Sequence, residues 1–377
     1  MEQSFWGEQL RKARLYRGMT ITELAEQSQC PRQMLSAYES GKSQPSDMTL
    51  DHLIKVLNFP KTYFFEQPEK YSTGTTYFRS LLTTNKRYRA EQEVKLEFIA
   101  QIYSFLEDYI EFPQCNLPTV QCDSPEQAAR VLRQHWKLGT RPIDNLITLV
   151  EDNGILVSSF HTTSDAVDAF SQKIEVRDCS TYIIGYSLNK TSATRIHFDI
   201  AHELGHICLH GWNQDLDSLT KEEFRELEDQ ANQFAAEFLL PSKEFRKDVS
   251  VNPLSLPYYK KLKAKWKVSI AAMIRKAYTL GVITADNYQM LVCTMQKRGQ
   301  RKEEPLDDTL MTAGPSLLRA AVLLLLQEEV FTPQSFMEEL SSAYKFTIDP
   351  KEIEYLINLP TGTLSYGKVL PFKLKSK

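Results

Sequence analysis

One stretch, residues 195–210, constrains the fold more than any other part of this chain of 377 residues. It contains an H-E-x-x-H motif that begins at His202 and ends at His206, and apolar residues recur around the motif at helical spacing. Two histidines four residues apart on an α-helix lie one above the other, about 5–6 Å apart at Cβ, so both imidazoles can reach one ion. The stretch therefore predicts a buried helix that carries a metal.

The acidic residue inside the motif is suited to proton transfer. Zinc lowers the pKa of a bound water molecule from about 15.7 toward about 7. Glu203 points to the side of the metal where such a water would lie, and a carboxylate there can take the proton as the water attacks a peptide carbonyl. Glu203 is therefore the candidate general base.

A third ligand is needed, because zinc hydrolases generally use three protein ligands and leave one position open. His210 is excluded because it stands four residues past His206, about 6 Å farther along a straight helix at about 1.5 Å per residue. Residues 222–240 predict a second helix in which Glu228 and Asn232 share a face. This spacing suits a ligand followed one turn later by a hydrogen-bond partner for a ligating histidine.

The two segments together resemble a known family. The run AHELGH-x-x-x-H followed by E-x-x-AN-x-FA-x-E-x-LLP is similar to the ImmA/IrrE family of zinc metallopeptidases. The resemblance implies a zincin-like core in which His202, His206 and Glu228 bind the metal and Glu203 is the general base. Zn²⁺ is the expected ion, although the same ligand set also suits Mn²⁺ or another divalent ion.

The N-terminal part of the chain resembles a second family. Residues 5–66 alternate short amphipathic helices with tight turns, and Thr20 with Glu23 forms a capping box at the start of one of them. The pattern LA-x-x-x-x-C-x-x-x-x-L-x-x-YE-x-GK-x-x-PS resembles the Cro/repressor (XRE-type) helix-turn-helix family. Two positions depart from that family, which prefers Gly at Gln29 and often has a phosphate-contacting Gln at Ile21.

The resemblance implies which side chains meet DNA. In that family the third helix enters the major groove, so four positions are expected to face base edges: Arg32, Gln33, Ser36 and Ala37. Three further residues are expected to contact phosphates: Lys42, Ser43 and Arg14. Residues 1–60 carry seven basic and seven acidic side chains, so one module should bind weakly and a dimer on two half-sites is expected. The alternative is a helical bundle reused for protein contacts.

The rest of the chain predicts a mainly α protein with a small β-sheet. The expected parts are a helix-turn-helix domain at 1–68, a linker with a long connecting helix at 69–118, a metallopeptidase domain at 119–300 and a C-terminal helical bundle of unknown role at 301–377. The apolar stripe of the connecting helix suits packing on its own chain or on a second copy. Residues 181–187 predict a strand, either at the sheet edge that holds a substrate peptide or in the sheet interior.

Charge and composition limit the partners and the cellular compartment that can be expected. The net charge of −3 gives no whole-molecule attraction to nucleic acid or to an anionic membrane, so any DNA contact must come from a local surface. There is no run of 18 apolar residues and no basic segment leading into an apolar one at the N-terminus. Six cysteines lack C-x-x-C spacing. We therefore expect a cytosolic protein with reduced cysteines and no membrane partner.

A DNA reader and a peptidase core in one chain allow two readings of function. In the first, the chain is a transcriptional regulator whose zinc-dependent endopeptidase cuts a repressor, an antitoxin or itself in a stress or phage-related response. In the second, the protease-like region acts only as a sensor or protein-interaction module. The first is favoured, because a binding module has no need for a general base beside a metal. Operator DNA, a repressor- or antitoxin-like substrate and a second copy are the expected partners.

The residue that stabilises the transition state stays open at this point. Four residues could take that role, and the sequence alone does not place them in space: Arg195, His197, Tyr258 and Tyr259. Asp199, three residues before His202, could orient that histidine, although capping roles are commoner for such a carboxylate.

Overall fold

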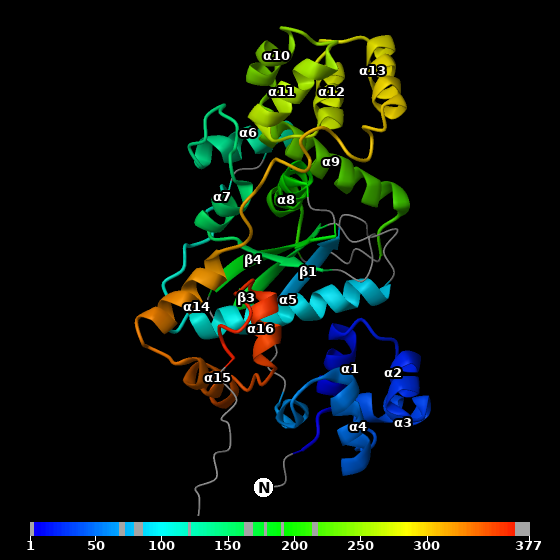
Figure 1. Ribbon diagram of the computed structural model, residues 1–377, viewed down its shortest axis with the longest axis vertical. Helices are drawn as coiled ribbons and strands as arrows, with labels where there is room; N and C mark the ends of the chain where they lie inside the picture. The colour runs from blue at the N-terminus through cyan, green and yellow to red at the C-terminus, as the bar shows by residue number, and fades with distance from the viewer. Residues whose placement is uncertain are drawn as a thin grey trace, which may run out of the picture. The chain divides into compact units, whose positions relative to one another are not determined.

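The structure is a computed structural model of the chain (Figure 1). It describes residues 4–67, 72–78, 86–119, 122–161, 169–176, 179–189, 192–212 and 218–365. Helices dominate these residues, and a single small sheet accompanies them, which confirms the expected fold class. The chain forms two compact units, one made of 1–70, 90–110 and 318–377, the other of 71–89 and 111–317.

The first unit begins with the expected short helices. They are α1 (Gly7–Tyr16), α2 (Ile21–Ser28), α3 (Arg32–Glu39), α4 (Asp47–Leu57) and a 3-10 turn, η1 (Lys61–Phe65). Thr20 and Glu23 cap α2 reciprocally, as their spacing predicts. Gln29 ends α2 with a φ of 56°, a left-handed conformation that explains why the helix-turn-helix pattern favours glycine there.

The long connecting helix, α5 (Lys86–Leu106), packs on its own chain within this unit. The ring of Phe98 lies 5.1 Å from that of Tyr16 and 5.0 Å from that of Phe346. The buried side of α5 therefore joins the helix-turn-helix to the C-terminal segment, and the apolar stripe needs no second copy to cover it.

The C-terminal helices belong to the same unit as the helix-turn-helix. They are α14 (Leu317–Gln327), α15 (Pro333–Ser342) and α16 (Pro350–Leu356). Glu352 of α16 accepts a hydrogen bond from Tyr16 Oη at 2.6 Å and pairs with Arg17 at 2.7 Å. The grouping thus differs from the four successive segments expected from sequence, because these contacts join residues more than 300 positions apart.

The second unit contains the sheet, whose strand order is β1-β3-β4-β2. Its strands are β1 (Ser72–Phe78), β2 (Leu156–Phe160), β3 (Ala169–Val176) and β4 (Cys179–Ser187). β4 pairs with β3 antiparallel and with β2 parallel. β4 is therefore an interior strand, which confirms one of the two alternatives left open for residues 181–187 and excludes the other, a substrate-holding edge.

Two long helices lie next to this sheet. α8 (Ala193–Leu209) contacts β3, β4 and α9 (Lys221–Leu239), as Figure 1 shows near the middle of the picture. Six shorter helices complete the unit: α6 (Pro125–His135), α7 (Leu146–Asp152), α10 (Ser242–Val249), α11 (Leu256–Trp266), α12 (Ile270–Thr279) and α13 (Ala285–Lys297). No helix among the described residues is long and apolar enough to cross a bilayer.

The segment after α13 is tied back to this unit by buried charge. Lys263 of α11 donates to Glu304 at 2.9 Å and to Asp307 at 2.6 Å, and the lysine side chain is fully buried. The Glu151 carboxylate of α7 accepts from the backbone N–H groups of Ser316 and Leu317. Residues 301–317 therefore pack with the unit that contains the sheet, which is why a boundary at residue 300 differs from the observed grouping.

Candidate functional site

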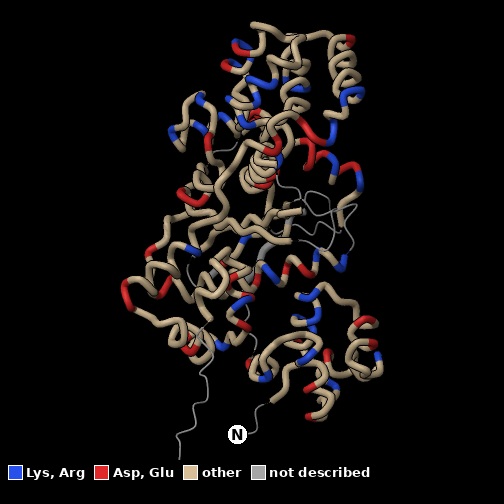
Figure 2. Tube along the Cα trace, viewed as in Figure 1, with Lys and Arg blue, Asp and Glu red and all other residues tan. Residues whose placement is uncertain are grey.

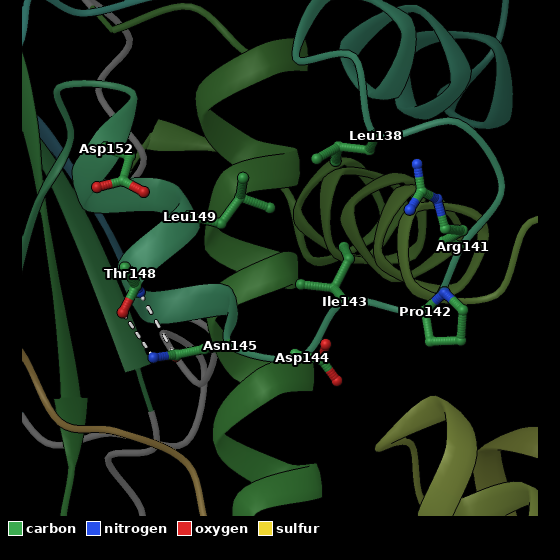
Figure 3. A pocket seen from close by; sticks show the side chains of 9 residues that line it. All are labelled: Leu138, Arg141, Pro142, Ile143, Asp144, Asn145, Thr148, Leu149 and Asp152. Carbon is green, nitrogen blue, oxygen red and sulfur yellow. Dashed lines mark hydrogen bonds between the residues drawn. The ribbon is translucent and has the colours of Figure 1, made fainter.

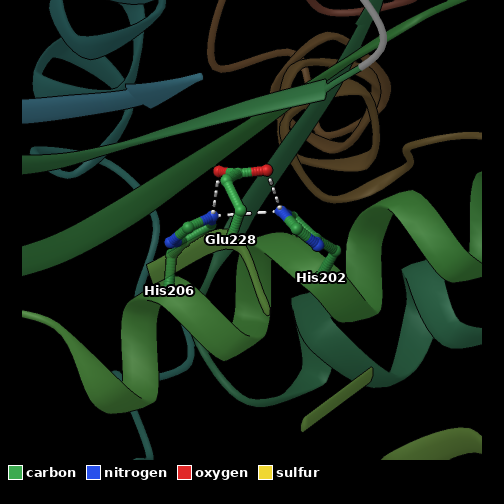
Figure 4. A group of neighbouring side chains, drawn as sticks. All are labelled: His202, His206 and Glu228. Carbon is green, nitrogen blue, oxygen red and sulfur yellow. Dashed lines mark hydrogen bonds and ion pairs between the residues drawn. The ribbon is translucent and has the colours of Figure 1, made fainter. Parts of the chain in front are cut away.

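Three side chains meet between α8 and α9. His202 and His206 of α8 bring their Nε2 atoms to 3.0 Å from each other, and the two carboxylate oxygens of Glu228 lie 3.4 and 3.2 Å from those atoms. Figure 4 shows both imidazoles and the carboxylate converging on one point. Both histidines are fully buried. The structure therefore brings together the three residues that the sequence suggested as metal ligands.

The spacing of these atoms fits a tetrahedral metal. Nitrogen and oxygen ligands lie about 2.0–2.1 Å from Zn²⁺, so any two of them on a tetrahedron are about 3.3–3.4 Å apart. The three observed separations, 3.0, 3.2 and 3.4 Å, are close to that value. Two imidazoles and one carboxylate are also a donor set that divalent metals accept. The residues present therefore form a possible metal site.

Electrostatics favours an ionised carboxylate at this point. Burial alone would raise the pKa of Glu228, but the rings of His202 and His206, when protonated, donate hydrogen bonds to the carboxylate and carry positive charge, which lowers the pKa to about 2. Glu228 is therefore negatively charged at neutral pH and can attract a cation.

α9 also fixes the ring of the first histidine. Asn232 Oδ1 lies 3.1 Å from His202 Nδ1. An amide oxygen can only accept, so His202 carries its proton on Nδ1 and presents the lone pair of Nε2 toward Glu228. Asn232 thus lies where the sequence placed a hydrogen-bond partner for a ligating histidine.

His210, which helical geometry excludes as a metal ligand, contacts His206 instead. Its Nδ1 lies 2.8 Å from His206 Nδ1, and its Nε2 lies 3.1 Å from Gln230 Oε1. Burial and the neighbouring His206 lower the pKa of His210 to about 4. Sequence reasoning missed this role, although the spacing of four residues after His206 was a visible signal.

The candidate general base is held by the sheet. Glu203 is fully buried, and its Oε2 accepts a hydrogen bond from Ser171 Oγ at 2.6 Å. Ser171 lies on β3 and is itself fully buried. No sequence signal pointed to Ser171, because residues 169–176 carry no motif.

Close packing of the two helices makes this convergence possible. A Cβ on Gly205 would lie 3.1 Å from both the Cα and the carbonyl oxygen of Ala231, and 3.2 Å from Phe234 Cβ. Only glycine fits at that crossing without a shift of α9. Gly205 therefore allows α9 to approach α8 closely enough for Glu228 to meet the histidines.

Three of the four residues left open as transition-state stabilisers have other partners. His197 is buried with Nε2 3.1 Å from Thr312 Oγ1, and burial, together with the charge of Lys267, lowers the pKa of His197 to about 4. Arg195 lies 3.7 Å from Asp199, and Tyr258 donates to the carbonyl of Asp248 at 2.9 Å. Burial raises the pKa of Tyr259. Asn232 contacts His202 Nδ1 and so can orient this ring, the role for which Asp199 was considered from the sequence.

The edge strand β1 pairs with the strand that carries Ser171. β1 pairs antiparallel with β3, and Tyr77 of β1 stands opposite Ser171 in the register. Gln172 donates to Thr76 Oγ1 at 2.7 Å across the same pair. The strand whose Ser171 reaches Glu203 is therefore paired on both sides, with β1 (residues 72–78) and with β4.

A separate pocket lies away from these residues. It has a volume of about 360 Å³ and is formed by the loop before α7 and by α7 itself (Figure 3). Asn145 caps α7 there and donates to Thr148 Oγ1 at 2.6 Å. None of the metal-site side chains lines this pocket.

The helix-turn-helix presents part of the expected reading surface. On α3, Arg32, Gln33 and Ser36 are exposed, while Ala37 is half-buried. Lys42 is exposed and Ser43 is half-buried after the helix. Figure 2 shows basic and acidic positions interleaved over these helices, in agreement with the balanced charge of residues 1–60.

Arg14, expected to contact phosphate, is committed elsewhere. Its guanidinium donates to both carboxylate oxygens of Glu39, at 2.6 and 2.8 Å, and to the carbonyl of Met19 at 2.9 Å. Its side chain is 10 % exposed. The expectation for Arg14 is therefore corrected: this arginine joins α1 to α3 and has no free face for a phosphate.

Comparison with known proteins identifies two regions. Residues 150–278 match a peptidase family model described as the IrrE N-terminal-like domain, and this match includes all four residues of the candidate site. Residues 10–64 match a helix-turn-helix model. No curated protein matches the chain. Both family resemblances seen in the sequence are confirmed.

Proposed function

We propose that this chain, which joins an XRE-type helix-turn-helix region to an IrrE N-terminal-like metallopeptidase region, is a DNA-binding regulator that hydrolyses peptide bonds with a divalent metal. His202, His206 and Glu228 would hold the metal, with Zn²⁺ as the proposed ion. The observation that carries the proposal is the convergence of these three side chains with a buried Glu203 next to His202.

The chemistry can be assigned to residues of the chain. A divalent ion at this site would polarise a peptide carbonyl and acidify a water molecule. The Glu203 carboxylate would take the proton of the attacking water and pass it to the amine that leaves. Ser171 would hold Glu203 in place through its hydrogen bond. Asn232 would keep His202 in the tautomer that binds metal.

The DNA-binding part rests on the family match and on the exposed side chains of α3. Arg32 and Gln33 can form bidentate contacts with guanine and adenine, respectively. Lys42 and Ser43 would contact phosphates, which position the helix without reading sequence. A protein that reads DNA acts where the DNA is, so we propose the cytosol as its site of action.

A homodimer is the proposed assembly on DNA. The reader is small and its charge is balanced, so affinity for a specific site would come from two copies on two half-sites. The same compact unit exposes Leu323 and Leu324 on α14, at 39 % and 47 %. Sedimentation of wild type and of Leu324→Glu, with and without operator DNA, tests whether this helix contributes to a dimer.

The substrate class follows from the combination of the two regions. A regulator that cuts protein would act on a repressor, on an antitoxin-like partner or on its own chain, in a stress or phage-related response. The second candidate function is a transcription factor whose protease-like region only senses or binds. The buried Glu203, with a hydrogen bond that orients its carboxylate, favours hydrolysis over this alternative.

Replacing Glu203 with glutamine tests the proposal. The variant leaves the three proposed metal ligands unchanged. It keeps a polar side chain of the same size at residue 203, but this side chain cannot take a proton. We expect unchanged metal content, unchanged operator binding and loss of cleavage of candidate repressors. If Glu203→Gln cuts its substrate as wild type does, hydrolysis by this site is excluded and the sensor function remains.

Glu228→Ala is the matched test of the ligand set. We expect it to take up much less divalent metal than wild type while retaining operator binding. Full metal occupancy in this variant would show that Glu228 is not a ligand.

A further inference from the structure

A chain of hydrogen bonds runs outward from the candidate metal site. His206 Nδ1 lies 2.8 Å from His210 Nδ1, and His210 Nε2 lies 3.1 Å from Gln230 Oε1. A neutral imidazole has one nitrogen that donates and one that accepts. The proton position on one ring therefore determines the proton position on the next.

The direction of this chain is set at its outer end. The Gln230 oxygen can only accept, so His210 carries its proton on Nε2 and its Nδ1 is an acceptor. His206 must then donate from Nδ1, which leaves a lone pair on its Nε2. That is the nitrogen that faces His202 at 3.0 Å and Glu228 at 3.2 Å.

We infer that His210 is a positioning residue, which holds His206 in the tautomer whose Nε2 can bind a cation, and that Gln230 sets the direction of the hydrogen bond between the two rings. The inference rests on the metal site proposed above and adds the device that prepares its second ligand. An outer partner of this kind typically contributes about 10–100-fold to metal affinity.

The backbone places His210 for this contact. His210 is the C-cap of α8, with extended φ and ψ of −114° and 153°, so the chain leaves the helical path at this residue. Its N–H still bonds to the His206 carbonyl at 3.1 Å, which keeps the two residues adjacent. Both rings lie 5.0 Å apart at their centroids. His210 thus contacts the side of His206 that faces away from Glu228.

The same helix supplies the partners of both histidines. Asn232 Oδ1 fixes His202, and Gln230 Oε1 fixes His206 through His210. With both Nδ1 atoms protonated, two lone pairs and the Glu228 carboxylate face one point, an arrangement that only a proton or a cation can satisfy. The hydrogen bonds therefore prepare the site for a cation in advance of its binding.

The first test removes or replaces the acceptor at position 210. Metal affinity is measured on the full-length protein by competition between Zn²⁺ and a chromophoric chelator. His210→Leu should lose about 10–100-fold in affinity, whereas His210→Gln, whose side-chain oxygen can accept from His206, should recover most of it. Equal affinities for the two variants, whether both are reduced or both unchanged, would overturn the inference, because a role in packing alone does not distinguish an acceptor.

The second test reverses the direction of the hydrogen bonds. Gln230→Glu keeps an acceptor opposite His210 and should retain the wild-type affinity within a few-fold. Gln230→Lys offers only donors, so it forces the proton of His206 onto Nε2 and should weaken Zn²⁺ binding by about 10-fold or more. Gln233 is exposed on the same helix, so Gln233→Glu and Gln233→Lys carry the same charges without this contact. A Gln233 pair that differs as much as the Gln230 pair would overturn the inference.

A spectroscopic readout separates this inference from the proposed function. In metal-free protein, imidazole ¹⁵N shifts should show His210 protonated on Nε2 and His206 protonated on Nδ1, and Gln230→Lys should reverse both. If these shifts are found while wild type binds no divalent metal, the metal site fails and the hydrogen-bond chain stands. If wild type binds Zn²⁺ and the shifts show the opposite tautomers, the metal site stands and the role of His210 is refuted.

Discussion

Ser171 Oγ on β3 lies 2.6 Å from Glu203 Oε2 on α8, so a strand of the sheet orients the carboxylate of the H-E-x-x-H motif. A hydrogen bond to a charged group is worth about 1.5–3 kcal/mol. Because this bond stabilises the ionised carboxylate of Glu203, the proposed base, its loss favours the protonated form. Ser171→Ala is therefore expected to lower kcat and to move the acid limb of the pH–rate profile to higher pH.

The control for this prediction is another buried serine of the sheet. Ser158→Ala on β2 removes a hydroxyl of equal size at a position that is 1 % exposed, on a strand that β4 separates from β3. It is expected to leave the acid limb where it is in wild type. A Ser171→Ala profile that falls in height but keeps its shape would assign Ser171 to packing and not to the base.

A second prediction concerns the crossing of α8 and α9. A Cβ at residue 205 would lie 3.1 Å from the backbone of Ala231, so Gly205→Ala must push α9 away by a few tenths of an ångström. Overpacking of this kind costs about 1–3 kcal/mol. We expect a lower free energy of unfolding together with weaker metal binding, since Glu228 moves with α9. Gly211→Ala, where a Cβ meets nothing within 4 Å, is the control that should change neither quantity.

The residues that meet at the site could be named from the sequence because each lies in a local pattern. His202 and His206 are one helical turn apart, and Glu228 and Asn232 repeat that spacing on the next helix. Helical periodicity extends over four residues, so it relates such pairs without knowledge of the fold. The order of the short N-terminal helices was readable for the same reason, since Thr20 and Glu23 mark a helix start within three residues.

Contacts between residues far apart in the sequence could not be predicted in this way. Ser171 comes to Glu203 only through the pairing of β3 with its neighbours, and nothing in residues 169–176 signals that contact. The C-terminal helices join the helix-turn-helix through pairs such as Tyr16 with Glu352. The family resemblance suggested Arg14 as a phosphate contact. The sequence could not reveal its actual partner, Glu39, which is 25 residues away on another helix. Periodicity carries no information over such distances.

The position of Arg14 gives a third prediction. Removing one partner of a buried ion pair leaves the other uncompensated, which costs about 3–5 kcal/mol. Arg14→Ala should therefore lower the free energy of unfolding in denaturant titrations. Arg32→Ala, at an exposed position of α3, should leave stability within about 0.5 kcal/mol of wild type and weaken operator binding. Equal stabilities of the two variants would contradict the structural role of Arg14.

A fourth prediction follows from His197. Burial lowers the pKa of His197 to about 4, whereas an unfolded histidine titrates near 6.5. Between these values the unfolded chain takes up a proton that the folded chain does not, so the stability present above about pH 6.5 is lost as the pH falls through this window. The loss is on the order of 3 kcal/mol.

His197→Gln keeps a polar side chain near Thr312 Oγ1 but cannot titrate. Its free energy of unfolding should therefore fall less steeply than that of wild type between pH 6.5 and 4. The measurement is the difference between the two proteins at each pH, from denaturant unfolding. A difference that does not vary with pH would show that His197 is not buried as a neutral ring.

The strand beside the general base gives the last prediction. An extended peptide that enters the site next to Glu203 would pair with β3, because Ser171 of that strand reaches the carboxylate, but β1 already pairs with β3 there. Replacing residues 72–78 with a Gly–Ser repeat of the same length keeps the chain connected and removes residues that favour a strand. We expect faster cleavage of an unfolded polypeptide by this variant than by wild type, with unchanged metal content. The same replacement combined with Glu203→Gln should be inactive, which assigns any gain to this site. A variant that cuts no faster than wild type would show that β1 does not restrict access to Glu203.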